Sequence, residues 1–142
     1  MFPEGRVIQP HAHATGEHLG RFKWGVARLI LETEPAPVLV PMWIEGMHGV
    51  MPEHRTWPKW LPRCGNRIVV VFGEAVNVET EFGLERERWR TLVQESGGEH
   101  DGQGLAVQAL RTGTKAVELR SEVAARVRER VLEVGRGSGF IK

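Results

Sequence analysis

The residues best suited to chemistry lie at the start of the chain, in the run Phe2-Pro3-Glu4-Gly5-Arg6. Gly5 allows the backbone to approach a ligand closely, and the planar guanidinium of Arg6 suits a phosphate group. The Glu4 carboxylate can accept a hydrogen bond from a hydroxyl. Together these residues could bind a phosphorylated polyol. Because Pro-x-Gly turns are common, the residue types alone favour an ordinary exposed turn over this ligand site.

Length and composition limit the classes of protein to which the chain can belong. Its 142 residues, 26% charged and 41% hydrophobic, suit one soluble domain. The net charge of +1 argues against a nucleic-acid binder that works through bulk charge. The single cysteine, Cys64, excludes an internal disulfide framework and a cysteine-based zinc cluster. No apolar run approaches the roughly 20 residues of a membrane-spanning helix, and no secretory signal is visible.

Hydrophobic spacing predicts the elements that position the N-terminal run. Apolar residues recur every three or four positions over 21–34, which predicts a helix that two prolines end. Apolar runs at 38–44 and 67–78 predict strands. Pro41 in the first run requires a sheet edge, a bulge or a break in pairing. The continuous second run suits a sheet that is covered on both faces.

The second half of the chain predicts two helices joined by a flexible loop. Residues 85–95 indicate a short charged helix, and 95–104 are rich in glycine and polar residues. Residues 115–134 predict an amphipathic helix that Gly135 ends. Its apolar stripe consists of Leu119, Val123, Val127, Val131 and Val134. The opposite, polar face carries Arg120, Glu122, Arg126, Arg128, Glu129 and Arg130.

Four segments resemble the glycerolipid acyltransferases and, among them, the tafazzin family. FPEGR at 2–6 resembles the third conserved block of the acyltransferases, and RFKWGVARLI at 21–30 looks like a segment typical of tafazzins. VPMWIEGM at 40–47 resembles the fourth block, a strand that ends in proline. LPRCGNRIVVVFGEAV at 61–76 is similar to a further tafazzin run. The segments occur in the family's order, so the chain is identified as a member of this family.

The resemblance implies a fold class, an activity and a set of binding residues. It implies acyl transfer between phospholipids and lysophospholipids without CoA or another cofactor, associated with cardiolipin remodelling at the mitochondrial membrane. Glu4, Gly5 and Arg6 would hold the glycerol and phosphate of the acceptor. Lys23 would assist electrostatically with anionic lipid, and Pro41 would shape the floor of the acyl site.

The same resemblance implies how the chain is organised. We expect an α/β fold, with a partial sheet and flanking helices, that forms the C-terminal part of a glycerolipid acyltransferase domain. Residues 1–80 would be that portion of the domain. The remaining bounds come from composition and apolar spacing, since the resemblance adds little after about residue 79. Residues 81–114 would be the charged helix and glycine-rich loop, and 115–142 the C-terminal amphipathic helix.

The catalytic block of the family is not found in the chain. Family chemistry depends on His-x-x-x-x-Asp, in which the histidine takes a proton from the acceptor hydroxyl and the aspartate orients it. None of the six histidines is followed by aspartate at that offset. His48 and Glu53 come closest, but Pro52 interrupts a helix between them. We therefore assign no catalytic residue and expect a fragment that is inactive alone. The alternative is a non-catalytic membrane-interface or partner-binding module that keeps the phosphate-binding turn.

Two further groups of residues have competing interpretations. Trp57, Trp60 and Leu61 lie in a proline-rich loop and suit a bilayer interface, with core packing as the alternative. Three histidines within 11–18 could bind a metal, but their spacing favours a solvated loop, so no metal site is expected.

Two other tryptophans, Trp24 and Trp43, are expected in the core. The C-terminal helix could lie on a membrane, but its apolar face lacks aromatic residues and its polar face mixes both charge signs. This pattern favours packing on the domain.

Overall fold

The computed structural model describes the chain except for residues 1–2, 6–18, 53–55, 58–59, 98–109 and 142. It confirms the predicted α/β class, with a partial sheet and flanking helices. In chain order the elements are α1 (Trp24–Glu32), β1 (Val38–Leu39), β2 (Met42–Glu45), α2 (Met47–Val50), β3 (Val69–Phe72), β4 (Val76–Asn77), α3 (Val78–Gly97) and α5 (Thr114–Gly137).

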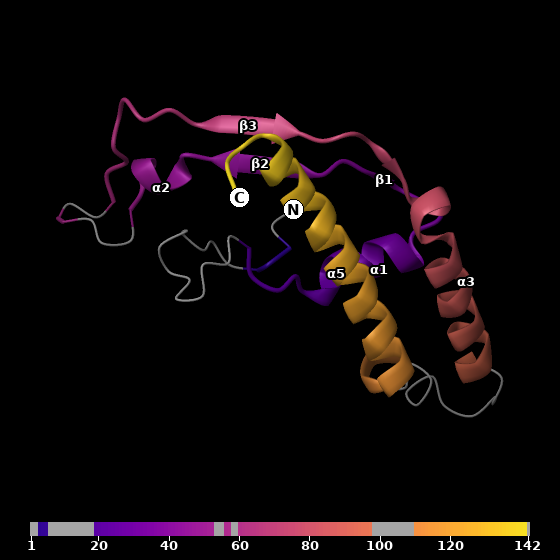
Figure 1. The fold of residues 1–142 in the computed structure, drawn as a ribbon. Coiled ribbons are helices and arrows are strands. Elements are labelled where there is room, and N and C mark those ends of the chain that lie inside the picture. Colours follow the sequence, from indigo (N-terminus) through magenta and orange to yellow (C-terminus); the bar gives the residue numbers. More distant parts are fainter. Residues whose placement is uncertain (1–2, 6–18, 53–55, 58–59, 98–109, 142) are drawn as a thin grey trace.

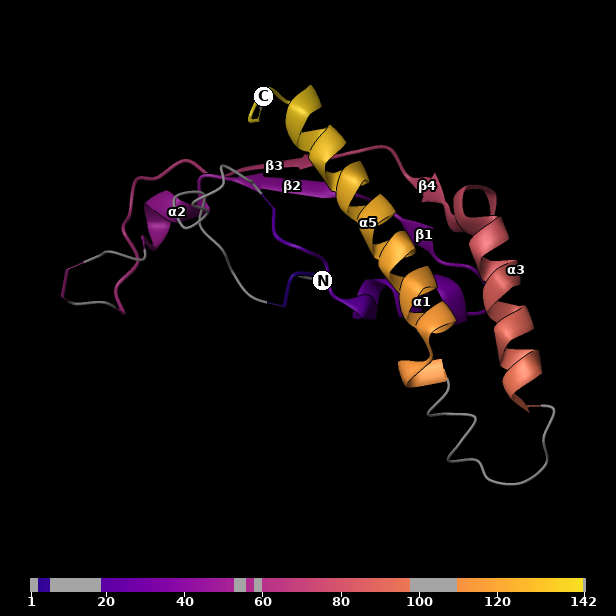
Figure 2. The same ribbon diagram turned by 60° about the horizontal axis from the view of Figure 1, so that its bottom comes forward.

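The strands form two short antiparallel ribbons, one of β1 with β4 and one of β2 with β3 (Figures 1 and 2). Each of the two predicted strands is therefore split in the middle. The first splits at Pro41, which confirms the expected break in pairing, because proline has no N–H to donate to a ladder. The Pro41 carbonyl accepts a hydrogen bond from the Gly73 N–H at 2.8 Å, and this bond joins the two bends.

The expectation of a sheet covered on both faces is wrong for the described residues. In β3, Val70 is 44% exposed and Phe72 is 67% exposed, and Met42, opposite Phe72, is also exposed. On the other face Trp43, opposite Val71, is buried against α5. Alternate residues of an antiparallel ribbon point to opposite faces, so helices on one side leave the other side uncovered.

The main core lies where α1, α3 and α5 meet, and α5 crosses α1 in both views (Figures 1 and 2). Leu119, Val123 and Val127 are buried there, which confirms this part of the predicted stripe. Arg120, expected on the solvent face of the same helix, is buried instead. It packs between tryptophan rings, one of them Trp24, which is itself 40% exposed rather than in the core.

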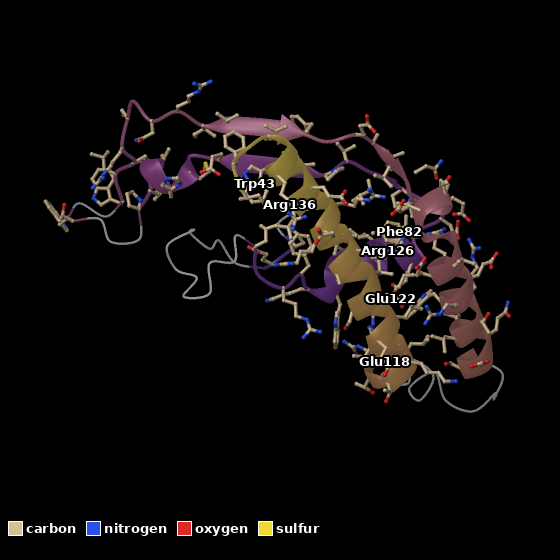
Figure 3. All side chains as sticks on the ribbon, viewed as in Figure 1. Trp43, Phe82, Glu118, Glu122, Arg126 and Arg136 are labelled. Atoms are coloured by element: carbon tan, nitrogen blue, oxygen red, sulfur yellow. The ribbon has the colours of Figure 1, made fainter. Side chains whose placement is uncertain are left out.

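Helix α3 begins earlier than expected, directly after β4. The Asn77 side chain accepts a hydrogen bond from the Glu79 N–H at 2.9 Å, as an N-cap residue does. The helix is kinked at Phe82, whose ring is fully buried. Figure 3 shows Phe82 beside Arg126 of α5, and the guanidinium lies 4.6 Å from the ring centroid. The kink separates these first turns from the later ones, which are the part of α3 that the sequence pattern predicts.

The prediction that Gly135 ends the C-terminal helix is wrong. Helix α5 continues to Gly137, and the Ser138 backbone N–H caps it by bonding the Val134 carbonyl at 3.1 Å. Gly135 is buried, and a Cβ on it would lie 2.8 Å from the Trp43 ring. The absence of a side chain therefore lets the indole pack directly on the helix backbone.

Replacing Gly135 by valine is expected to lower the free energy of unfolding by about 1–3 kcal/mol, the usual cost of overpacking a core. The indole leaves too little room for even one methyl group. Urea unfolding measures the change. Gly137→Val is the matched control, because nothing lies within 4 Å of a Cβ at that position of the same helix. Equal stability of the two variants would contradict the packing argument.

Candidate functional site

Residues 3–5 form a turn that packs on the segment preceding α1. The Lys23 backbone N–H donates to the Pro3 carbonyl at 2.8 Å. The Gly20 N–H donates to a carboxylate oxygen of Glu4. Gly5 has a φ of +70°, a left-handed conformation that favours glycine. Two hydrogen bonds therefore fix the turn to the residues that lead into α1.

The side chain of Lys23 crosses the turn at its glycine. A Cβ on Gly5 would lie 2.7 Å from Lys23 Nζ, so the ammonium occupies the space beside the bare backbone. Gly5 and Lys23 are both exposed to solvent. Three of the predicted binding residues, Glu4, Gly5 and Lys23, thus lie together. Arg6 lies outside the described residues.

An arginine that sequence reasoning placed on a solvent face holds this segment from the other side. Arg128 of α5 donates from Nη2 to the Leu19 carbonyl at 2.7 Å and from Nε to the Gly20 carbonyl at 3.1 Å. The Gly20 peptide group thus bonds Glu4 through its N–H and Arg128 through its carbonyl. Arg128 and Gly20 are 108 positions apart, and no local pattern in the sequence indicates such a contact.

The start of α1 adds positive potential to the same place. Lys23 is the N-cap residue and makes no side-chain cap, and the first turn contains no acidic residue. The first N–H groups of a helix have no partner within it and carry the positive end of its dipole. These donors, the Lys23 ammonium and the exposed Gly5 backbone suit an anion such as a phosphate group.

Glu4 and Pro41 have contacts of a different kind. One Glu4 oxygen bonds Gly20, so within the described residues Glu4 positions the turn, and its contact with a ligand hydroxyl stays a prediction. Pro41 is buried at the bend between β1 and β2, where a Cβ on Gly73 would lie 2.9 Å from its ring and 2.5 Å from Val134 of α5. Its role as the floor of an acyl site also stays a prediction.

The three residues predicted at a membrane interface are strongly exposed. Trp57 is 85%, Trp60 74% and Leu61 52% exposed. Core packing, the alternative interpretation, does not hold for them in this structure, and their contact with a bilayer stays a prediction. None of the helices in the described segments is both long and apolar enough to cross a membrane.

His48, in the sequence pattern closest to a catalytic dyad, lies in α2. Among the described residues its acidic partner is Glu45, and His48 Nδ1 is 3.8 Å from Glu45 Oε1. Glu53 lies outside the described residues. Trp43 Nε1 donates to the other Glu45 oxygen at 3.3 Å. The histidine–carboxylate distance is too long for a hydrogen bond, so His48 and Glu45 do not form a hydrogen-bonded dyad in the structure.

A metal site has no support from the described residues. Among them, no group of three or more histidine, cysteine, aspartate or glutamate side chains could hold an ion. The three histidines within 11–18 lie outside the part that the structure describes.

Comparison with known proteins shows what the chain is similar to. No family model matches it. It is 31% identical to tafazzin of Saccharomyces cerevisiae, over 94% of this chain and 35% of that protein. It is 44% identical to tafazzin of Drosophila melanogaster, over 37% of this chain and 12% of that protein. It is 29% identical to N-acylphosphatidylethanolamine synthase of Arabidopsis thaliana, over 59% of this chain and 28% of that protein. The chain thus spans about a third of the length of its yeast relative.

Proposed function

The chain belongs to the tafazzin-related acyltransferase family, and on this premise we propose that it forms the headgroup-binding part of a phospholipid–lysophospholipid transacylase. The observation that carries the proposal is the exposed turn at 3–5. There the Gly5 backbone, the Lys23 ammonium and the first turn of α1 lie together. A lysophospholipid acceptor brings a phosphate next to its free hydroxyl, and this cluster of donors suits that phosphate.

The proposed roles follow from these contacts. Lys23 and Arg6 neutralise the phosphate of the acceptor, while Gly5 lets the backbone approach it. Glu4 holds the turn in place and can accept a hydrogen bond from a glycerol hydroxyl. Pro41 shapes the floor of the acyl site. The 142 residues contain no His-x-x-x-x-Asp, so we assign the catalytic base to none of them.

We place the chain's action at a membrane. The exposed Trp57, Trp60 and Leu61 support contact with a bilayer interface, where amphipathic rings are favoured. By analogy with the tafazzins, the proposal is peripheral association with a mitochondrial membrane and a part in cardiolipin remodelling. Phospholipids and lysophospholipids are the proposed partners.

Vesicle binding tests the headgroup site. Arg6→Gln and Lys23→Gln are each expected to weaken binding to vesicles of anionic phospholipid, Arg6→Gln by about 1–3 kcal/mol, the loss of a charge-assisted hydrogen bond. For Lys23→Gln we expect about 1 kcal/mol, the worth of one cation at an anionic surface. Co-sedimentation with vesicles measures both changes.

The control removes a cation elsewhere. Lys115→Gln takes an exposed lysine from the first turn of α5, so an equal loss there would mean that only total charge matters. Glycerol 3-phosphate should compete with the vesicles, and glycerol should not. Unchanged binding by both Arg6→Gln and Lys23→Gln would contradict the headgroup site.

A second candidate function is a non-catalytic module that binds a membrane interface and keeps the phosphate-binding turn. The exposure of Trp57 and Trp60 favours it, because bilayer contact through these rings needs no catalytic group. The two candidates differ in whether the chain can support acyl transfer when the rest of a catalytic domain is present.

A further inference from the structure

A groove between α1, α3 and the beginning of α5 is separate from the turn at 3–5. Its volume is about 1010 Å³, and neither the turn nor Lys23 lines it. Its apolar lining includes Trp24, Leu31, Trp89 and Val93. The groove is therefore large enough for a ligand with an apolar body.

A buried arginine forms part of the groove wall. Arg120 is 4% exposed, and its guanidinium lies 4.7 Å from the ring centroid of Trp24 and 5.8 Å from that of Trp89. Its Nε donates to the Ala116 carbonyl at 3.0 Å, and its Nη2 donates to the Arg111 carbonyl at 2.7 Å. Nη1 makes no hydrogen bond with any residue that the structure describes and is not fully enclosed, so a ligand in the groove can reach it.

The glutamates of the groove are already paired with other arginines. Glu32 forms an ion pair with Arg28 at 2.9 Å, and Glu34 forms one with Arg90 at 2.8 Å. Both of these arginines also line the groove. Both glutamates that line the groove therefore already form an ion pair with an arginine other than Arg120.

Two lining arginines remain without a carboxylate among the described residues, Arg111 and Arg120. Glu118 and Glu122 lie on the same helix as Arg120 (Figure 3). They are not among the residues that line the groove. Glu122 pairs with Arg88 instead, at 3.1 Å. Burial lowers the pKa of Arg120 from its ordinary value, and the nearby negative charge of Glu32 offsets this effect only in part. An anion in the groove would supply the remaining counter-charge.

We propose that this groove binds an amphipathic anion, with its carboxylate or phosphate group at Arg120 and Arg111 and its apolar part against Trp24, Trp89 and Val93. Aromatic stacking holds the Arg120 guanidinium in position, so its free Nη1 is preorganised for an anionic oxygen. A bare anion would leave most of the groove unfilled. The site goes beyond the proposed headgroup site, because it uses neither the turn nor Lys23.

Calorimetric titration of the full chain tests the proposal, with probes kept below their micelle concentrations. Octyl phosphate or octanoate should bind, and the tighter of the two identifies whether the natural ligand carries a phosphate or a carboxylate. Inorganic phosphate and octyl glucoside should bind much more weakly, because the first lacks an apolar chain and the second lacks a negative charge. Equal binding of either one would overturn the proposal.

Variants locate the binding. Val93→Glu adds a negative charge to the groove at a residue that is 42% exposed, so it should weaken octyl phosphate binding about fivefold or more. Leu84→Glu is the matched control on the same helix, 75% exposed and outside the groove, and should bind normally. Arg120→Gln, checked for folding by circular dichroism, should weaken binding roughly tenfold.

This experiment can contradict the groove proposal without contradicting the headgroup proposal. If the groove is a site, octyl phosphate binding that Val93→Glu weakens should persist in the Lys23→Gln variant, whatever binding the turn at 3–5 contributes. Binding that Lys23→Gln weakens and Val93→Glu does not would assign the probe to the turn at 3–5. That result would overturn the groove proposal and leave the headgroup proposal intact.

Discussion

Replacing Arg86 by alanine is expected to lower the free energy of unfolding by about 3–5 kcal/mol, the cost of breaking a buried ionic network from one side. The Arg86 side chain is fully buried on α3. Its Nη1 donates to the Ile30 carbonyl, and its Nη2 donates to the Thr33 carbonyl at 3.2 Å and to Glu34 at 2.7 Å. Its Nε lies 3.0 Å from Glu79 Oε2. The two groups form an ion pair, but their geometry is not that of a hydrogen bond.

These contacts explain why the effect should be large. A helix leaves its last carbonyls without partners, and Arg86 satisfies two carbonyls at the end of α1, one of them on the last turn and one on the C-cap residue Thr33. Removing the guanidinium would leave a buried carbonyl unpaired and open a cavity between α1 and α3. Urea unfolding followed by circular dichroism measures the change.

Arg90 provides the matched control for this prediction. It lies one helical turn from Arg86 and bonds the same Glu34 oxygen at 2.8 Å, but its side chain is 47% exposed. Arg90→Ala should therefore change stability little, since exposed ion pairs contribute little. Similar losses for Arg86→Ala and Arg90→Ala would mean that the charge pair with Glu34, rather than the buried carbonyl contacts, determines the effect.

The network has a defined dependence on pH. Hydrogen bonding to Arg90 is the main reason why the pKa of Glu34 lies below its ordinary value, with smaller contributions from the nearby charges of Arg86 and Arg90. A carboxyl group with a lowered pKa contributes stability above its unfolded pKa, and the contribution is lost as the pH falls through the lowered folded value. The Arg86 measurement is therefore best made near neutral pH, where Glu34 is ionised in both states.

Much of the helical core could be predicted because its apolar residues repeat at the helical period. Leu119, Val123 and Val127 form such a stripe, and all three are buried. Pro41 likewise predicted the break between β1 and β2. These features depend on a residue's own chemistry and on neighbours within one or two turns, which a single sequence displays.

The arginines could not be predicted in the same way. Arg86, Arg120 and Arg128 belong to charged helical stretches, where cations normally face solvent. The structure instead directs Arg86 and Arg128 onto backbone carbonyls of distant segments, including those of Leu19 and Gly20. It buries Arg120 against tryptophan rings of other helices, with its hydrogen bonds on nearby carbonyls. No local pattern distinguishes an arginine that pairs with a remote carbonyl from one that is solvated.

The sequence indicated which residues belong to the candidate site, but not that they lie together in the structure. Family resemblance singled out Glu4, Gly5 and Lys23, although the turn and the lysine are many residues apart. Their meeting depends on hydrogen bonds between backbone groups, such as the one from Lys23 to Pro3, and every residue except proline can donate in this way. Residue types alone therefore cannot indicate that contact.

The purified chain is expected to transfer no acyl groups from phosphatidylcholine to a lysophospholipid above the rate of a heat-denatured sample. A positioned general base contributes typically 10²–10⁴-fold, and none of the 142 residues is assigned that role. Mass spectrometry of the lipids after incubation measures the product. Conversion that survives His48→Ala would contradict the argument from the missing dyad. Conversion that His48→Ala abolishes would instead assign the base to His48 beside Glu45.

Inactivity alone does not separate a part of an enzyme from a non-catalytic module, because both hypotheses predict it. A chimera in which this chain replaces the matched 35% of the yeast tafazzin separates them. If the turn at 3–5 holds the acceptor's phosphate, the chimera should transfer acyl groups, and Lys23→Gln should reduce the rate more than Lys115→Gln does. A chimera that folds and binds anionic vesicles yet transfers no acyl groups would favour the non-catalytic module. In that chimera the rest of the yeast protein is present, so the absence of a base from this chain would not explain the inactivity.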